Sequence, residues 1–70
     1  MKEITKQIRA EVKKTILEVG GTKNLLNKDV IAICEKFCGK DYLSRWTDEI
    51  CEISTTVSNQ INYFKYSKNM

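Results

Sequence analysis

Apolar residues recur at intervals of three and four along most of this 70-residue chain, and no proline interrupts them. Such spacing gathers side chains on one face of an α-helix, whereas a half-buried strand needs strict alternation. Three glycines occur, as Gly20-Gly21 and as Gly39, and they fall between the periodic segments. The pattern predicts an all-α, single-domain bundle of three main helices, at about 2–19, 23–38 and 41–65, with disorder in the last few residues.

The first predicted helix has one apolar face and two charged flanks of opposite sign. Its glutamates, Glu3, Glu11 and Glu18, lie on one flank. The other flank carries a basic stripe, whose members are Lys2, Lys6, Arg9 and Lys13. Solvated helices more often mix the two signs at i,i+4 spacing. Two interpretations stay open: a solvated face of a Lys-rich protein, or a binding stripe for phosphate or an acidic partner.

The second segment allows two helix starts, one at Thr22 and one at Asn27, so it predicts either one helix or a kinked pair. Asp29 is well placed for the helix dipole at the second start. Its apolar stripe covers roughly 160°, which predicts the most buried helix of the bundle.

Asp41 follows Gly39 and is a suitable N-cap for the third helix. Apolar residues then recur with spacings of three and four, and Gln60 interrupts the series before Phe64. The seam consists of Leu43, Trp46, Ile50, Ile53 and Val57. Two heptads are too few to predict a coiled coil. We interpret the seam as core against the other helices, with a homodimer contact as the alternative.

The C-terminal part of this helix is the most ambiguous stretch. Residues 54–58 are poor helix formers, so a β-hairpin over about 53–66 is an alternative. Against the hairpin, Ser58-Asn59-Gln60 lacks the glycine that tight hairpin turns favour. The sequence therefore favours a helix, with fraying or a kink near Thr56 as open alternatives.

Catalytic and metal chemistry lack their usual residues. The chain has no histidine, so a Cys or Ser nucleophile loses its commonest base and zinc loses a common ligand. We find no phosphate-binding loop and no hydrolase or protease motif. The three cysteines, Cys34, Cys38 and Cys51, are interpreted as reduced thiols that pack as small hydrophobes. We expect a protein that is not an enzyme and that has no cofactor and no metal.

A helix-turn-helix is the second functional interpretation, because a helix ending near Phe37, a three-residue turn containing Gly39 and a capped helix form its outline. The DNA-contacting residues would be Lys40, Tyr42, Ser44 and Arg45. Charge opposes this interpretation. The would-be recognition helix sets Arg45 against Asp41, Asp48, Glu49 and Glu52, whereas phosphate contacts need cations.

Location and partner follow from what the chain lacks and from its charge map. It begins without the apolar region of a secretory signal and has no apolar run long enough for a bilayer, so we expect a cytoplasmic protein with no membrane contact. Lys, Asn and Ile supply 23 of 70 residues, a bias typical of AT-rich genomes. We expect a small non-enzymatic binding protein that occupies a macromolecular surface. One function consistent with this expectation is a phage or mobile-element modulator or inhibitor of nucleic-acid machinery. Its partner would be a protein of a nucleic-acid-processing complex. The alternative is a helix-turn-helix DNA-binding transcriptional regulator.

Overall fold

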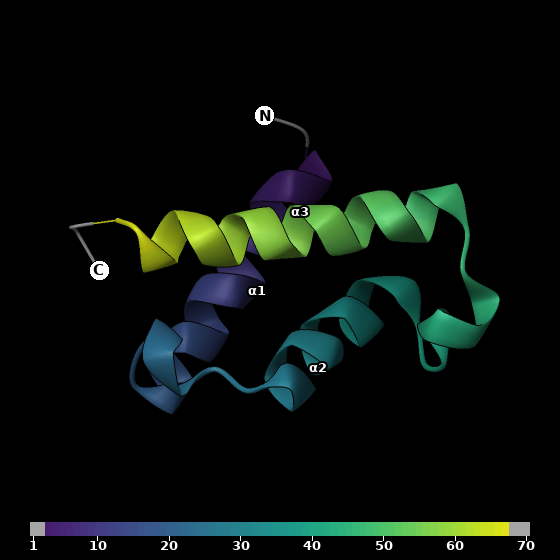
Figure 1. Ribbon diagram of the computed structural model, residues 1–70. Coiled ribbons are helices and arrows are strands. Elements are labelled where there is room, and N and C mark those ends of the chain that lie inside the picture. The colour runs from purple at the N-terminus through teal and green to yellow at the C-terminus, as the bar shows by residue number, and fades with distance from the viewer. Residues whose placement is uncertain (1–2, 68–70) are drawn as a thin grey trace.

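A computed structural model of the chain describes residues 3–67, which form three α-helices joined by two short 3-10 helices. Helix α1 spans Glu3–Val19, α2 spans Asn27–Cys38 and α3 spans Asp48–Lys65 (Figure 1). The 3-10 helices η1 and η2 span Thr22–Asn24 and Tyr42–Arg45. The all-α bundle is confirmed within residues 3–67, and the expected disorder of the last few residues concerns 68–70, outside the described part.

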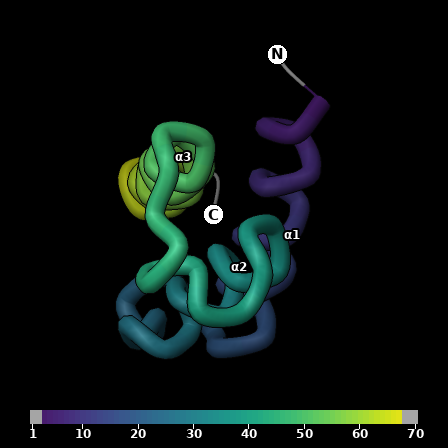
Figure 2. Tube along the Cα trace, turned by 90° about the vertical axis from the view of Figure 1, so that its right-hand side faces the viewer, coloured from purple at the N-terminus to yellow at the C-terminus, as the bar shows by residue number. Residues whose placement is uncertain are grey.

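Each of the three α-helices contacts the other two. Figure 2 looks along α3 and shows α1 and α2 beside it. Helix α3 contributes the most buried side chains: Ile50, Ile53, Val57, Gln60 and Phe64. Helix α2 buries only Ile33 and Cys34, so the prediction that the second helix is the most buried was wrong. Its broad stripe is wider than its contact with the bundle, and Leu26 and Ile31 are left exposed.

The segment between Gly20 and Leu26 resolves the open question about the second helix. Helix α1 ends at Val19, and Asn24 of η1 donates its side-chain amide to the Val19 carbonyl at 2.9 Å. Helix α2 then starts at Asn27, and the backbone N–H of Leu26 donates to the Asp29 carboxylate at 2.9 Å. The kinked pair is therefore the correct alternative, with Leu26 instead of Asn27 at the cap position.

The predicted start of the third helix at Asp41 was wrong. Asp41 has a left-handed backbone with φ 60°, and the chain turns through η2 before α3 begins at Asp48. The N-cap is Thr47, whose hydroxyl accepts the backbone N–H of Ile50 at 3.2 Å. Thr47 followed by two acidic residues at the positive end of the helix dipole was the better start signal.

Helix α3 is one α-helix through the stretch for which a hairpin was the alternative. The run of poor helix formers is tolerated because Val57, in its middle, is fully buried against the other helices. The Thr56 hydroxyl donates to the Glu52 carbonyl one turn earlier at 2.9 Å. Packing thus overrides local propensity here.

Among the described residues, none of the helices is both long enough and apolar enough to cross a membrane.

Candidate functional site

The basic stripe of α1 lies along the line of contact between α1 and the C-terminal half of α3. Lys6 and Lys13 are exposed and Arg9, between them, is half-buried. Lys2, the fourth predicted member, lies outside the described residues. The stripe therefore borders a second helix instead of facing open solvent on both sides.

Arg9 is held in place by two residues of α3. Its Nε donates to Gln60 Oε1 at 2.7 Å, and its guanidinium carbon lies 4.6 Å from the centre of the Tyr63 ring. Gln60 is buried, so its carbonyl gains a charged donor where water is scarce. Stacking on Tyr63 adds a cation–π contact. These two contacts hold the cation in one orientation.

These side chains border a basic groove of about 500 Å³ between α1 and α3. Its lining consists of Lys6, Arg9, Ala10, Lys13, Tyr63 and Phe64. Three of the six are cations, and no acidic side chain lines it. The groove combines positive charge with an aromatic ring, a pairing suited to carboxylate or phosphate groups.

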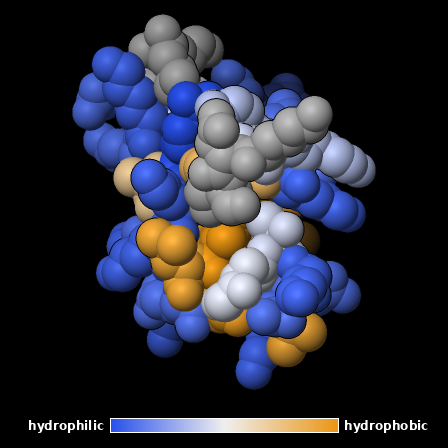
Figure 3. All heavy atoms as spheres, turned by 90° about the vertical axis from the view of Figure 1, so that its left-hand side faces the viewer, coloured by the Kyte–Doolittle hydropathy of each residue, from blue (hydrophilic) through white to orange (hydrophobic). Residues whose placement is uncertain are grey.

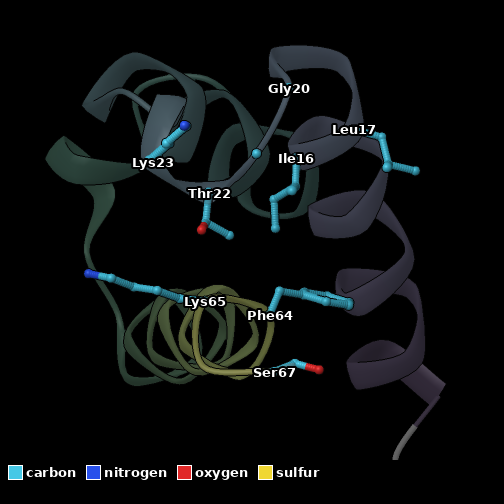
Figure 4. A pocket seen from close by; sticks show the side chains of 9 residues that line it. Ile16, Leu17, Gly20, Thr22, Lys23, Phe64, Lys65 and Ser67 are labelled. Atoms are coloured by element: carbon cyan, nitrogen blue, oxygen red, sulfur yellow. The ribbon is translucent and has the colours of Figure 1, made fainter. Parts of the chain in front are cut away.

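An apolar pocket of about 460 Å³ adjoins the basic groove, because Phe64 lines both. Ile16 and Phe64 point into it from α1 and α3, while the ends of Lys23 and Lys65 lie on its far side (Figure 4). Seen from the end of the molecule where α3 finishes, hydrophobic surface gathers between hydrophilic flanks (Figure 3). The basic groove and the apolar pocket thus form one contiguous surface with a cationic border.

The four residues of the DNA-contacting hypothesis differ in exposure, and Lys40, Ser44 and Arg45 are exposed. Tyr42 is buried and Ser44 donates its hydroxyl to the Asp41 carbonyl at 2.8 Å. Arg45 donates through Nη2 to the carbonyls of Cys38 at 3.0 Å and Lys40 at 2.9 Å. Lys40 is exposed. The two helices are separated by residues 39–47, not by the three-residue turn on which the hypothesis rested.

The predicted seam is split between two environments. Ile50, Ile53 and Val57 lie on α3 and are buried, whereas Leu43 and Trp46 belong to the turn before it and are exposed. The 3-4-3-4 spacing continues through the turn, but α3 starts only at Asp48. Leu43 and Trp46 therefore do not lie on the helix face that the spacing predicts.

Cys34, Cys38 and Tyr42 lie close together where α2 meets η2. Cys34 is buried, Cys38 is half-buried and Cys51, on α3, is exposed. Burial, together with a hydrogen bond to the Cys34 side chain, raises the pKa of Tyr42 to about 12. Burial also raises the pKa of the Cys38 thiol, and the neighbouring Cys34 adds to the rise. Both groups are therefore neutral near pH 7, as packed side chains should be.

Within the described residues, cysteines and carboxylates form no group of three or more that could hold a metal ion. Comparison with known proteins gives no matching family model, no matching curated protein and no matching solved structure. The fold and the surface together define a small helical bundle with one basic, partly apolar face.

Sequence reasoning identified the cations of α1 but not their neighbours. The sequence pattern assigns no site role to Tyr63, Lys23 or Lys65. Gln60 is the residue from which the contact could have been predicted, because a polar side chain inside an apolar series is expected to be buried and to have a hydrogen-bond partner. Its partner, Arg9, is 51 residues away, so the pairing required the structure.

Proposed function

We propose that this is a small non-enzymatic binding protein whose basic groove and apolar pocket together take an acidic segment of a protein partner. The observation that carries the proposal is Arg9, fixed by Gln60 and Tyr63 at the centre of a groove with lysines on either side. A cation that is already oriented loses less conformational freedom on binding than a free side chain would.

The apolar pocket favours a protein over a nucleic acid as the partner. A carboxylate-bearing helix or strand can place an aliphatic side chain against Ile16 and Phe64 while its acids meet Lys6, Arg9 and Lys13. A phosphate backbone has no aliphatic group to fill that pocket. Action on nucleic-acid machinery, as a phage or mobile-element modulator, is the context that the composition suggests.

The test is a titration of the isotope-labelled protein with three probes, followed by amide chemical shifts. The probes are a helical Leu/Glu peptide, the same peptide with Gln for Glu, and duplex DNA. We expect the Leu/Glu peptide to shift amides of Lys6 to Lys13 and of Tyr63 to Lys65, and the Gln peptide to bind at least about tenfold more weakly.

Two charge-reversal variants of equal net charge provide the control. Lys6→Glu with Lys13→Glu alters the groove, whereas Lys14→Glu with Lys28→Glu alters exposed lysines that do not line it. Loss of peptide binding in the first variant alone supports the proposal. Equal loss in both variants would mean that the net charge of the protein, and not the groove, causes the binding. Stronger binding to DNA, with a steep salt dependence, would favour the DNA-binding alternative instead.

Partner identification uses the same pair of variants as bait. A protein captured from the source cells by the wild-type chain and by the Lys14/Lys28 variant, but not by the Lys6/Lys13 variant, is the expected result. Capture that is indifferent to the Lys6/Lys13 reversal would count against the groove.

A further inference from the structure

The end of the molecule that carries η2 exposes large apolar side chains, and it lies opposite the end of α3 that forms the apolar pocket (Figure 1). Leu43 is 62% exposed, Trp46 49% and Ile31 40%. Buried Tyr42 joins them, since its ring lies 6.3 Å from that of Trp46 and it lines one depression with Ile31 and Leu43. We call Ile31, Tyr42, Leu43 and Trp46 the Trp46 patch. Exposed clusters of this kind mark contact sites, and tryptophan often dominates binding energy.

The Trp46 patch is held rigidly by the turn that carries it. Arg45 bonds two backbone carbonyls, those of Cys38 and Lys40, and so ties η2 to the end of α2. The Ser44 hydroxyl closes the turn on the Asp41 carbonyl, and Tyr42 packs in the core beneath. An apolar surface that is already fixed loses little conformational entropy when a partner docks.

Two acidic side chains line the depression of the patch. Its depression, of about 210 Å³, is lined by Glu35 and Asp41 beside Ile31 and Leu43. A cavity of about 150 Å³ can hold benzene, so the depression has room for one aliphatic side chain. Asp48 follows Trp46 by two residues, while the guanidinium of Arg45 is turned to backbone carbonyls. Lys40 and Arg45 are both exposed cations of the turn, and the Arg45 guanidinium also donates to the carbonyls of Cys38 and Lys40.

We propose that the Trp46 patch docks a basic amphipathic helix of a protein partner. An aliphatic side chain of that helix fills the depression at Leu43, a second lies on the indole of Trp46, and its lysines or arginines meet Glu35 and Asp41. A helix offers this combination because residues three and four apart share a face. A second copy of the chain fits less well, since a symmetric contact would set these carboxylates against themselves.

The proposal concerns a different surface, and a partner of opposite charge, from the basic groove, so the two can succeed or fail separately. Trp46 is the sole tryptophan of the chain and therefore reports directly on the patch. The test titrates the protein with a helical Leu/Lys peptide and with its Leu/Glu counterpart, and records tryptophan emission. We expect a blue shift with the Leu/Lys peptide alone, because only this helix covers the indole.

Variants separate the apolar and the charged contributions. Leu43→Ser should weaken Leu/Lys binding about tenfold or more, whereas Leu26→Ser, a similarly exposed leucine just before α2, should leave it unchanged. Glu35→Gln with Asp41→Asn should lower affinity and flatten its salt dependence, and Glu3→Gln with Glu18→Gln on α1 should not. Asparagine is chosen at Asp41 because it tolerates the left-handed backbone.

Three results would overturn the proposal. One is an emission that responds equally to both peptides or to neither. Another is a Leu43→Ser variant that binds as the wild type does. The last is a blue shift that appears on concentrating the protein alone, together with a dimer in sedimentation, because the patch would then be occupied by a second copy.

Discussion

Gln60 brings a polar side chain into an apolar helix face, and Arg9 makes that possible. The 2.7 Å hydrogen bond joins the first helix to the last at a buried acceptor. Within the described residues, no buried side-chain nitrogen or oxygen lacks a partner. Arg9 thus stabilises the contact between α1 and α3 and also lies at the centre of the basic groove. Its contribution to stability and its contribution to binding need separate experiments.

We expect Arg9→Ala to lower the free energy of unfolding by about 2 kcal/mol, because a buried acceptor loses a charged donor and Tyr63 loses its cation. Urea denaturation measures the change, and exposed Lys13→Ala, expected within about 0.5 kcal/mol, is the control. In a Gln60→Leu background the Arg9→Ala loss should shrink, since no acceptor is left unpaired. If Arg9→Ala lowers the free energy of unfolding equally in both backgrounds, the hydrogen bond to Gln60 is not the cause of the loss.

Tyr42 predicts a stability that falls at high pH. Its pKa is about 12 in the folded protein and about 10 in an unfolded chain, so the folded state keeps the phenol proton longer. The resulting stability is present below about pH 10 and is lost as the pH rises to about 12. The raised pKa of Cys38 acts in the same direction from about pH 9.

Urea midpoints measured between pH 9 and pH 12 test this expectation. Tyr42→Phe should decline less steeply with pH than the wild type, whereas Tyr66→Phe, which alters an exposed ring, should decline in parallel with it. Parallel curves for all three proteins would show that Tyr42 does not titrate differently on folding.

At the scale of elements, the turn between α2 and α3 is built around Gly39 and Arg45. Gly39 has φ 89°, and a Cβ there would lie 2.9 Å from Nη2 of Arg45. The same guanidinium bonds the carbonyls of Cys38 and Lys40. The glycine therefore supplies both a left-handed backbone and the space in which Arg45 closes the end of α2.

Gly39→Ala should lower the free energy of unfolding by about 1–2 kcal/mol, from backbone strain and displacement of Arg45. Chemical denaturation is the measurement, with exposed Lys40→Ala as the neighbouring control. In an Arg45→Ala background the cost should fall, because only the backbone strain persists. The same cost in both backgrounds would mean that Arg45 moves aside freely.

This turn also explains which parts of the fold could be predicted from the sequence. Ile50, Ile53 and Val57 follow a period that a helix imposes locally, and so do the cations of α1. Leu43 and Trp46 fit the same period but stand in η2, because the left-handed backbone at Asp41 turns the chain first. The contacts of Arg9 with α3 join residues over fifty positions apart, which no local period encodes.

At the scale of the molecule, the core closes within one chain. Ile8, Val12 and Val57, from the first and last helices, are fully buried without a second copy. A lone domain of this size still buries only about 60% of its unfolded surface, so its margin of stability is small. Charge is divided along the body, with cations bordering the groove and carboxylates bordering the Trp46 patch.

We therefore expect the urea midpoint to be independent of protein concentration over a hundredfold range, as mass action requires for a monomer. Circular dichroism and fluorescence should give the same midpoint. A midpoint that rises with concentration would mean that folding is coupled to association. In that case the rise should persist in Leu17→Ser and vanish in Leu43→Ser if the Trp46 patch is the contact.

The pairing of α1 with α3 has a consequence for the chain as it is made. A ribosome adds about 5–20 residues per second, so α1 waits seconds for the helix that covers Ile8 and Val12. An isolated helix of 17 residues is marginal in water, and during that interval its apolar face has no cover. A nascent chain arrested before Phe64 should therefore be readily cleaved by protease, and protection should begin only when the C-terminal half of α3 has left the exit tunnel.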